Sequence, residues 1–160
     1  MLLLISRWLH IGSAIVAVGG AVFIRVALLP ASSATLDDPT HERFREAIRK
    51  RWAIYVHTCI TVLLFTGAVN FLLLALPPRI NAIPYHPIFG IKFLAALGVF
   101  FIASVLVGRG AGLAGIRAQR AKWLTILIVL AGLIVLISGV LNQIRTGQAA
   151  MIPPAATRAS

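Results

Sequence analysis

Four long apolar stretches divide the chain, and each is bounded by prolines, glycines or clusters of charge. Each stretch is near or above the roughly 18 residues that identify a membrane-spanning helix. We therefore predict helices over residues 3–29, 52–76, 87–107 and 123–142. Pro30 and Pro77-Pro78 are expected to end the first two helices, because proline lacks the amide hydrogen that a helix interior uses. The glycine-rich segment from Gly108 to Gly112 is expected to end the third.

The segments between these helices differ in character. Residues 31–51 form the only strongly polar connection and hold all four acidic residues of the chain. Within it, Thr40 is a suitable cap for a short helix that continues into the second span. The connection 79–87 is rich in turn-forming residues (Asn81, Pro84, Pro87), so the third helix is expected to start at Pro87 or Ile88. The tail 146–160 is expected to be loosely ordered.

The composition agrees with a membrane protein. Hydrophobic residues make up 59% of the 160 residues, against about 45–50% in soluble domains, and the mean hydropathy is +0.95. Arg7 follows an apolar start, which is the reverse of a signal peptide, so we expect the first helix to be retained. The prediction is an all-α integral membrane four-helix bundle, with a single transmembrane domain over residues 1–145.

Basic residues in the short connections predict the orientation of the bundle. Residues 31–51 hold five Lys or Arg, the connection between the third and fourth helices holds four, and the opposite side holds only Arg7, Arg79, Arg145 and Arg158. This asymmetry predicts that both termini lie outside, in what we expect to be a bacterial inner (plasma) membrane. The net charge of +11 then reflects topology and anionic lipid, and nucleic-acid binding is not needed to explain it.

Ionisable residues inside the spans are the candidates for function, because a bilayer makes them costly. At 1.5 Å per residue, His10, Lys92 and Asn70 lie at a similar depth near the outer face. His57 and Arg25 lie near the inner face, so His10 and His57 cannot ligate the same iron. The spans contain no Asp or Glu, which excludes a carboxylate relay for ion transport.

Each candidate has more than one interpretation. His10 follows Trp8 and stands over small residues at helical spacing (Ala14, Ala17, Ala21). It is either satisfied by water or a neighbouring helix, or it ligates haem iron or another metal, or it transfers protons. Lys92 either extends to the headgroups or pairs with an anion such as a haem propionate or porphyrin carboxylate. His86 is a candidate second ligand or an interfacial residue.

Other polar side chains in the spans are expected to be structural. His57 is expected to hydrogen-bond Thr61 or to contact headgroups, and Arg25 to extend to the inner leaflet. One face of the second span carries polar residues suited to hydrogen bonds between helices: Cys59, Thr66 and Asn70.

Short motifs in the first three spans resemble the copper-resistance protein D superfamily. They are Leu9-His10, Gly19-Gly20, Phe23-Ile24-Arg25, Leu29-Pro30, Arg49-Lys50-Arg51, Thr66-Gly67, Gly90-Ile91-Lys92 and Gly108-Arg109. That superfamily includes the HemJ-type protoporphyrinogen oxidases, four-helix membrane proteins that bind b-type haem. The resemblance implies that His10 and Lys92 serve haem binding and activity. Gly90 departs from the pattern, because HemJ proteins commonly have a histidine there.

Three functional hypotheses follow. The first is a haem b protein that transfers electrons or, as an oxidoreductase, oxidises a porphyrin or protoporphyrinogen. Its cofactor-binding residues are His10, with His86 as a second ligand, Lys92 and Asn70; His10 and Lys92 are also the catalytic candidates. The second is copper transport or sensing through His10, His86 and Met1. The third is a structural subunit of a larger membrane complex. Expected partners are the lipid bilayer, a redox partner or such a complex, and further copies of the chain.

Overall fold

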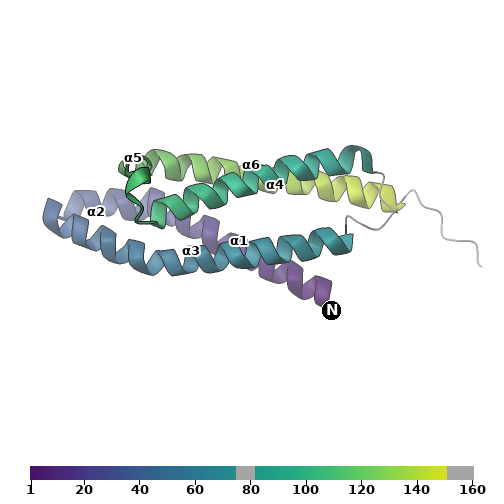
Figure 1. The fold of residues 1–160 in the computed structure, drawn as a ribbon, viewed down its shortest axis with the longest axis horizontal. Helices are drawn as coiled ribbons and strands as arrows, with labels where there is room; N and C mark the ends of the chain where they lie inside the picture. Colours follow the sequence, from purple (N-terminus) through teal and green to yellow (C-terminus); the bar gives the residue numbers. More distant parts are fainter. Residues whose placement is uncertain (75–81, 151–160) are drawn as a thin grey trace, which may run out of the picture.

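The computed structural model describes residues 1–74 and 82–150, and within them the chain forms long helices that lie along a common axis (Figure 1). The elements are α1 (Leu2–Phe23), the π-helix η1 (Ile24–Leu28), α2 (Leu29–Thr35), α3 (Asp38–Leu74), α4 (Ala82–Val107), the 3-10 turn η2 (Ala111–Leu113), α5 (Ala114–Ala118) and α6 (Arg120–Ala150).

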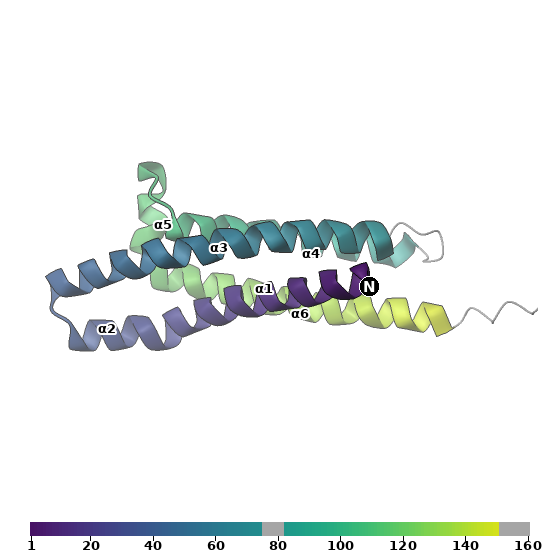
Figure 2. The ribbon, with the colours of Figure 1, turned by 90° about the horizontal axis from the view of Figure 1, so that it is seen from below.

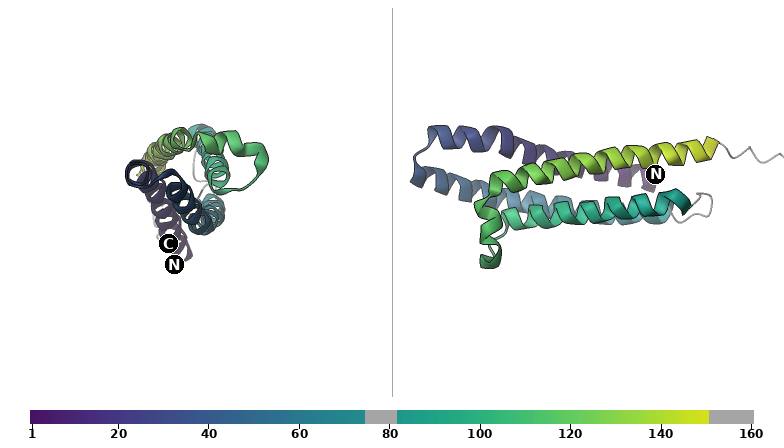
Figure 3. Two further views of the ribbon diagram at one scale, coloured as in Figure 1. Left: turned by 90° about the vertical axis from the view of Figure 1, so that its left-hand side faces the viewer. Right: turned by 90° about the horizontal axis from the view of Figure 1, so that it is seen from above.

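The four long helices are arranged around a central axis. α1 packs against α3, α3 against α4, and α4 against α6, which returns to contact α1. The view along the axis in the left panel of Figure 3 shows this arrangement. Each helix therefore has two neighbours and one side that faces the centre.

The outer surface of the bundle is apolar. Four helices are long and apolar enough to cross a membrane, and large side chains such as Trp8, Phe65 and Leu94 are more than half exposed. Water would make such a surface unfavourable, whereas lipid would cover it. The predicted four-helix membrane bundle is confirmed at this level, while its orientation stays a prediction.

The first helix does not end at Pro30, as the sequence predicted. It continues to Thr35 through a π-helical turn at Ile24–Leu28, in which the Leu29 amide donates to the Ile24 carbonyl. Proline in an α-helix lacks a donor and crowds the carbonyl four residues earlier. The wider π turn directly before Pro30 accommodates this irregularity and lets the helix proceed.

The polar connection 31–51 is almost entirely helical. Only Leu36 and Asp37 separate α2 from α3, and the predicted short helix near Thr40 is the start of α3. The segment from Leu2 to Thr35 has 34 residues, about 51 Å at 1.5 Å per residue, against about 30 Å for the bilayer core. α2 and the start of α3 therefore extend as a hairpin beyond the rest of the bundle (Figure 2).

The other helix boundaries also differ from the predicted ones. α4 starts at Ala82, so Pro84 lies in its first turn, where proline costs little. Pro87 lies inside the helix, where it lacks the amide hydrogen that the helix interior uses. The end of α4 at Val107 is as predicted. α6 spans Arg120–Ala150, so residues 146–150 are helical and not loose. The predicted stop at Pro77-Pro78, together with residues 151–160, lies outside the described residues.

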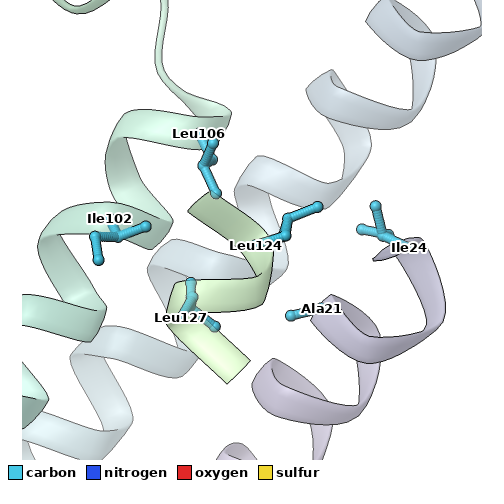
Figure 4. Packing of buried hydrophobic residues seen from close by; sticks show 6 residues of the cluster. All are labelled: Ala21, Ile24, Ile102, Leu106, Leu124 and Leu127. Carbon is cyan, nitrogen blue, oxygen red and sulfur yellow. The ribbon is translucent and has the colours of Figure 1, made fainter. Parts of the chain in front are cut away.

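A buried cluster holds three helices together at the end of the bundle where α6 begins. Its members come from α1 with η1, α4 and α6: Ala21, Ile24, Ile102, Leu106, Leu124 and Leu127 (Figure 4). At the same end, Arg49 of α3 donates to the carbonyls of Val107 (2.7 Å) and Gly108 (3.3 Å). Val107 is the last residue of α4 and Gly108 follows it, so the guanidinium caps the C-terminus of that helix.

Gly20 allows a close approach between α1 and α3. A Cβ atom at Gly20 would overlap the indole ring of Trp52, whereas a Cβ atom at the neighbouring Gly19 would meet nothing within 4 Å. Trp52 itself packs against the buried cluster, so its ring has little freedom to move aside.

Gly20→Ala is expected to destabilise the bundle by about 1–3 kcal/mol, because the added methyl group overpacks the contact with Trp52. The midpoint of thermal unfolding in detergent would measure this. Gly19→Ala is the matched control and is expected to be neutral or slightly stabilising, since alanine is the better helix former. Equal midpoints for the two variants would contradict the close packing.

Candidate functional site

A cavity of about 800 Å³ lies between the four helices. Its volume is within the range of about 300–1,000 Å³ typical of small-molecule and cofactor sites. Most of its lining is aliphatic or aromatic, and its polar side chains gather toward the two ends. Toward the N-terminus of α1 the lining includes Arg7, His10, Asn70 and Lys92, and at the start of α6 it includes Arg120. We call these the His10 end and the Arg120 end.

The cavity faces the small residues that the sequence placed below His10. Ala14, Ala17 and Ala21 all line it from α1. Because alanine projects only a methyl group, this face of the helix leaves space on the axis that larger side chains would fill. The predicted groove under His10 is therefore part of the cavity wall.

His10 points into the bundle and not toward lipid. Its ring is half-buried and lines the cavity, and its Nδ1 lies 2.8 Å from Oγ1 of Thr66 in α3. The Thr66 side chain is only 2% exposed. The prediction that Thr66 hydrogen-bonds between helices is confirmed, and its partner is the candidate histidine itself.

The direction of this hydrogen bond follows because the threonine hydroxyl has only one proton to donate. The Thr66 hydroxyl has one proton, and its Oγ1 lies 2.6 Å from the Val62 carbonyl of its own helix, which can only accept. Thr66 must therefore accept from His10, so Nδ1 of the imidazole carries the proton. The other ring nitrogen, Nε2, then keeps its lone pair. A histidine in this form can ligate a metal or accept a proton through Nε2.

The contact between α1 and α3 around His10 is built from small and polar residues. Ser6, one helical turn before His10, donates from Oγ to the Thr66 carbonyl at 3.4 Å. A Cβ atom at Gly67 would lie 3.7 Å from Cε1 of His10, an ordinary van der Waals contact. The Thr66-Gly67 pair therefore supports the ring from one side without crowding it.

Lys92 and Asn70 lie at the same end of the cavity, as the depth argument predicted. Lys92 of α4 is half-buried, lines the cavity and lies within electrostatic range of the His10 ring. Asn70 of α3 has a buried Oδ1 atom with no hydrogen-bond partner among the described residues. A buried polar atom without a partner is costly, so this amide marks a place where a ligand or water can bind.

The remaining candidates lie away from this arrangement. His57 is exposed on the outside of α3, with Nδ1 2.7 Å from the Ala53 carbonyl. Thr61 donates to the backbone carbonyl of His57 and not to its ring, so the expected side-chain pair is absent. Cys59 is buried. His86 belongs to the first turns of α4, but its side chain lies outside the described residues, so its role as a second ligand stays a prediction.

Arg25 hydrogen-bonds a neighbouring helix, and its expected extension to the inner leaflet stays a prediction. Its Nε donates to the Ala121 carbonyl (3.1 Å) and to Oγ1 of Thr125 (3.0 Å), which joins η1 to α6. Arg120 also lines the cavity, although the sequence indicates only a basic residue of a connecting loop at this position. The signal that could have found it is its position directly before a long apolar run, where helix rotation can turn it inward.

No protein-family model, no curated protein and no solved structure matches this chain. Within the described residues, no group of three or more His, Cys, Asp or Glu side chains could hold a metal ion. Met1 is 98% exposed and does not line the cavity. The structure thus establishes a four-helix membrane protein with a polar-ended axial cavity, and membership of a family stays a prediction.

Thr66→Val is expected to destabilise the protein by about 1–3 kcal/mol, because it removes the acceptor of a buried N–H group. Thr66→Ser keeps the hydroxyl and is expected to retain most of the stability. Thermal unfolding in detergent would measure both.

Thr61→Val is the matched control, because Thr61 is exposed and its hydroxyl bonds only within its own helix. We expect its effect to stay within about 0.5 kcal/mol. If the variants at positions 61 and 66 lost the same stability, the bond between His10 and Thr66 would have no energetic role.

Proposed function

We propose that the chain is a membrane-embedded b-type haem protein, in which His10 is the axial ligand and Lys92 binds a carboxylate of the porphyrin. Its activity is electron transfer or the oxidation of a porphyrin or protoporphyrinogen. The observation that carries the proposal is the hydrogen bond from His10 to Thr66. It leaves Nε2 with a free lone pair, which can bind iron, on the wall of an apolar cavity.

The second support is the chemistry of the His10 end. A haem is a large, mostly apolar ring with two carboxylates, so it needs an apolar enclosure with cations at one side. The cavity supplies the enclosure, and Lys92 and Arg7 supply positive charge beside His10. Asn70 lies at the same end of the cavity, and its side-chain NH2 group can donate to a carboxylate.

Each of these residues has a distinct role in the proposal. Haem, when bound, supplies one-electron chemistry at its iron. Thr66 fixes the tautomer and orientation of the His10 ring, which is the usual task of the partner of a metal-binding histidine. Lys92 orients the ring through a carboxylate, and the apolar walls keep water away. The resemblance to HemJ-type proteins supports the same assignment of His10 and Lys92.

The purified protein is expected to show a Soret band, with sharp bands on reduction by dithionite, when it is expressed with sufficient haem. His10→Ala is expected to abolish or strongly shift these bands, because it removes the axial ligand. His57→Ala is the control and is expected to leave them unchanged, since His57 is on the outer surface. A featureless spectrum after haem supplementation, or an unaltered spectrum in His10→Ala, would refute the proposal.

Lys92→Met is expected to weaken haem binding about tenfold or more, because a hydrogen bond to a charged group contributes about 1.5–3 kcal/mol. Titration of the apoprotein with haem and with haem dimethyl ester would test this. The ester carries no carboxylate, so wild type and Lys92→Met should bind it equally. An equal loss of affinity for both ligands would show that Lys92 acts by packing and not by pairing with a carboxylate.

A further inference from the structure

Arg120 is a buried cation at the far end of the cavity from His10. It is 9% exposed, it lines the cavity from the first turn of α6, and its Nε atom has no hydrogen-bond partner. No hydrogen bond or ion pair reaches its guanidinium from the part of the chain that the structure describes. A guanidinium buried without a partner is unfavourable, so an anion from outside the protein would stabilise it.

Glu42 is the acidic residue within electrostatic range of Arg120, and it and the neighbouring Glu46 already have basic partners. Glu46 and Glu42 have basic partners within 4.0 Å: Arg49 (2.6 Å), Arg109 (3.7 Å) and Lys50 (3.9 Å) for Glu46, and Arg45 (3.3 Å) for Glu42. Arg45 also has a buried Nε atom without a partner. Because Arg45 and Arg49 lie within electrostatic range of Arg120, this end of the bundle carries a positive excess.

The cavity beside Arg120 is apolar and continues toward His10. Its walls here come from η1, α3, α4 and α6: Ile24, Trp52, Val56, Ala103, Leu106 and Leu124. The contact between α1 and α6 is less extensive than the other contacts between neighbouring long helices.

We propose that the Arg120 end of the cavity binds an anionic phospholipid, with the phosphate on Arg120 and an acyl chain in the apolar part. Charge and shape both favour this occupant. The anionic phosphate of the lipid matches the cationic Arg120, and its long apolar chain matches the long apolar wall of the cavity. A free phosphate ion would meet the same guanidinium but would leave the adjoining cavity unfilled.

This site lies at the opposite end of the same cavity from the haem site, and the proposal does not rest on haem binding. Ile24 lies beside the Arg120 end and is 14 residues after His10 in the sequence, about 21 Å along a helix. Because the two ligands would share one cavity, the lipid titration is made on protein without haem, and the visible spectrum is recorded separately.

The test is a lipid titration of the delipidated full chain in a neutral detergent, followed by thermal unfolding. Phosphatidylglycerol is expected to raise the unfolding midpoint until the effect saturates. Phosphatidylcholine with the same acyl chains is expected to leave the midpoint unchanged. Arg120→Gln is expected to weaken the response to phosphatidylglycerol about tenfold or more, because it removes the charge-assisted hydrogen bonds to the phosphate. Lys122→Gln, an exposed position two residues later, is the control and should respond as wild type does.

Two further measurements separate the headgroup from the chain. Glycerol phosphate, which has the anion without acyl chains, is expected to have little effect at concentrations where phosphatidylglycerol saturates. Ala103→Leu narrows the apolar part and is expected to weaken the response to phosphatidylglycerol while Arg120 is intact. Without lipid, Arg120→Gln is expected to be at least as stable as wild type, since it removes an unpaired buried charge.

Several outcomes would overturn the proposal. They are an equal response to the two phospholipids, an unchanged response in Arg120→Gln, or a response to glycerol phosphate as strong as that to phosphatidylglycerol. Failure of Arg120→Gln to fold would also overturn it, by showing that Arg120 has an essential partner within the protein. A normal haem spectrum together with any of these results would leave the haem proposal intact.

Discussion

The hydrogen bond between His10 and Thr66 is the interaction on which the organisation of this bundle depends. A bilayer core offers no water to a polar side chain, so an imidazole placed there must find its partner in the protein. Thr66 can accept because it gives its own proton to the Val62 carbonyl. The bond thereby sets the rotation of α1 against α3, directs the small residues of α1 toward the axis, and leaves one ring nitrogen available.

The bundle therefore reverses the usual distribution of apolar and polar side chains between the surface and the centre of a soluble protein. Large apolar side chains such as Phe65 and Leu94 cover its outside, while His10, Lys92 and Arg120 face a cavity at the centre. The buried polar side chains at the two ends of that cavity differ in where their partners come from. His10 has a partner in the neighbouring helix, whereas Arg120 has none in the described part of the chain and is suited to an anion from outside.

The sequence predicted the four spans well, because the length of an apolar run is a local property of the chain. It also placed His10, Lys92 and Asn70 at one level, since helix rise converts sequence position into depth. Helix ends were less predictable: Pro30 is accommodated by a π turn, and the polar residues after Asp38 continue the helix of α3. The partner of His10 and the inward position of Arg120 depend on helix rotation. When a helix is apolar on all sides, its sequence gives little indication of which face points into the bundle.

The axial cavity couples the stability of the fold to its contents. Side chains that border an empty space lack contacts on one side, and a cavity destabilises a protein in proportion to its volume. Any molecule that binds only the folded bundle adds stability that grows with its free concentration. A molecule that fills this cavity would therefore act on the lifetime of the folded bundle as well as on its chemistry.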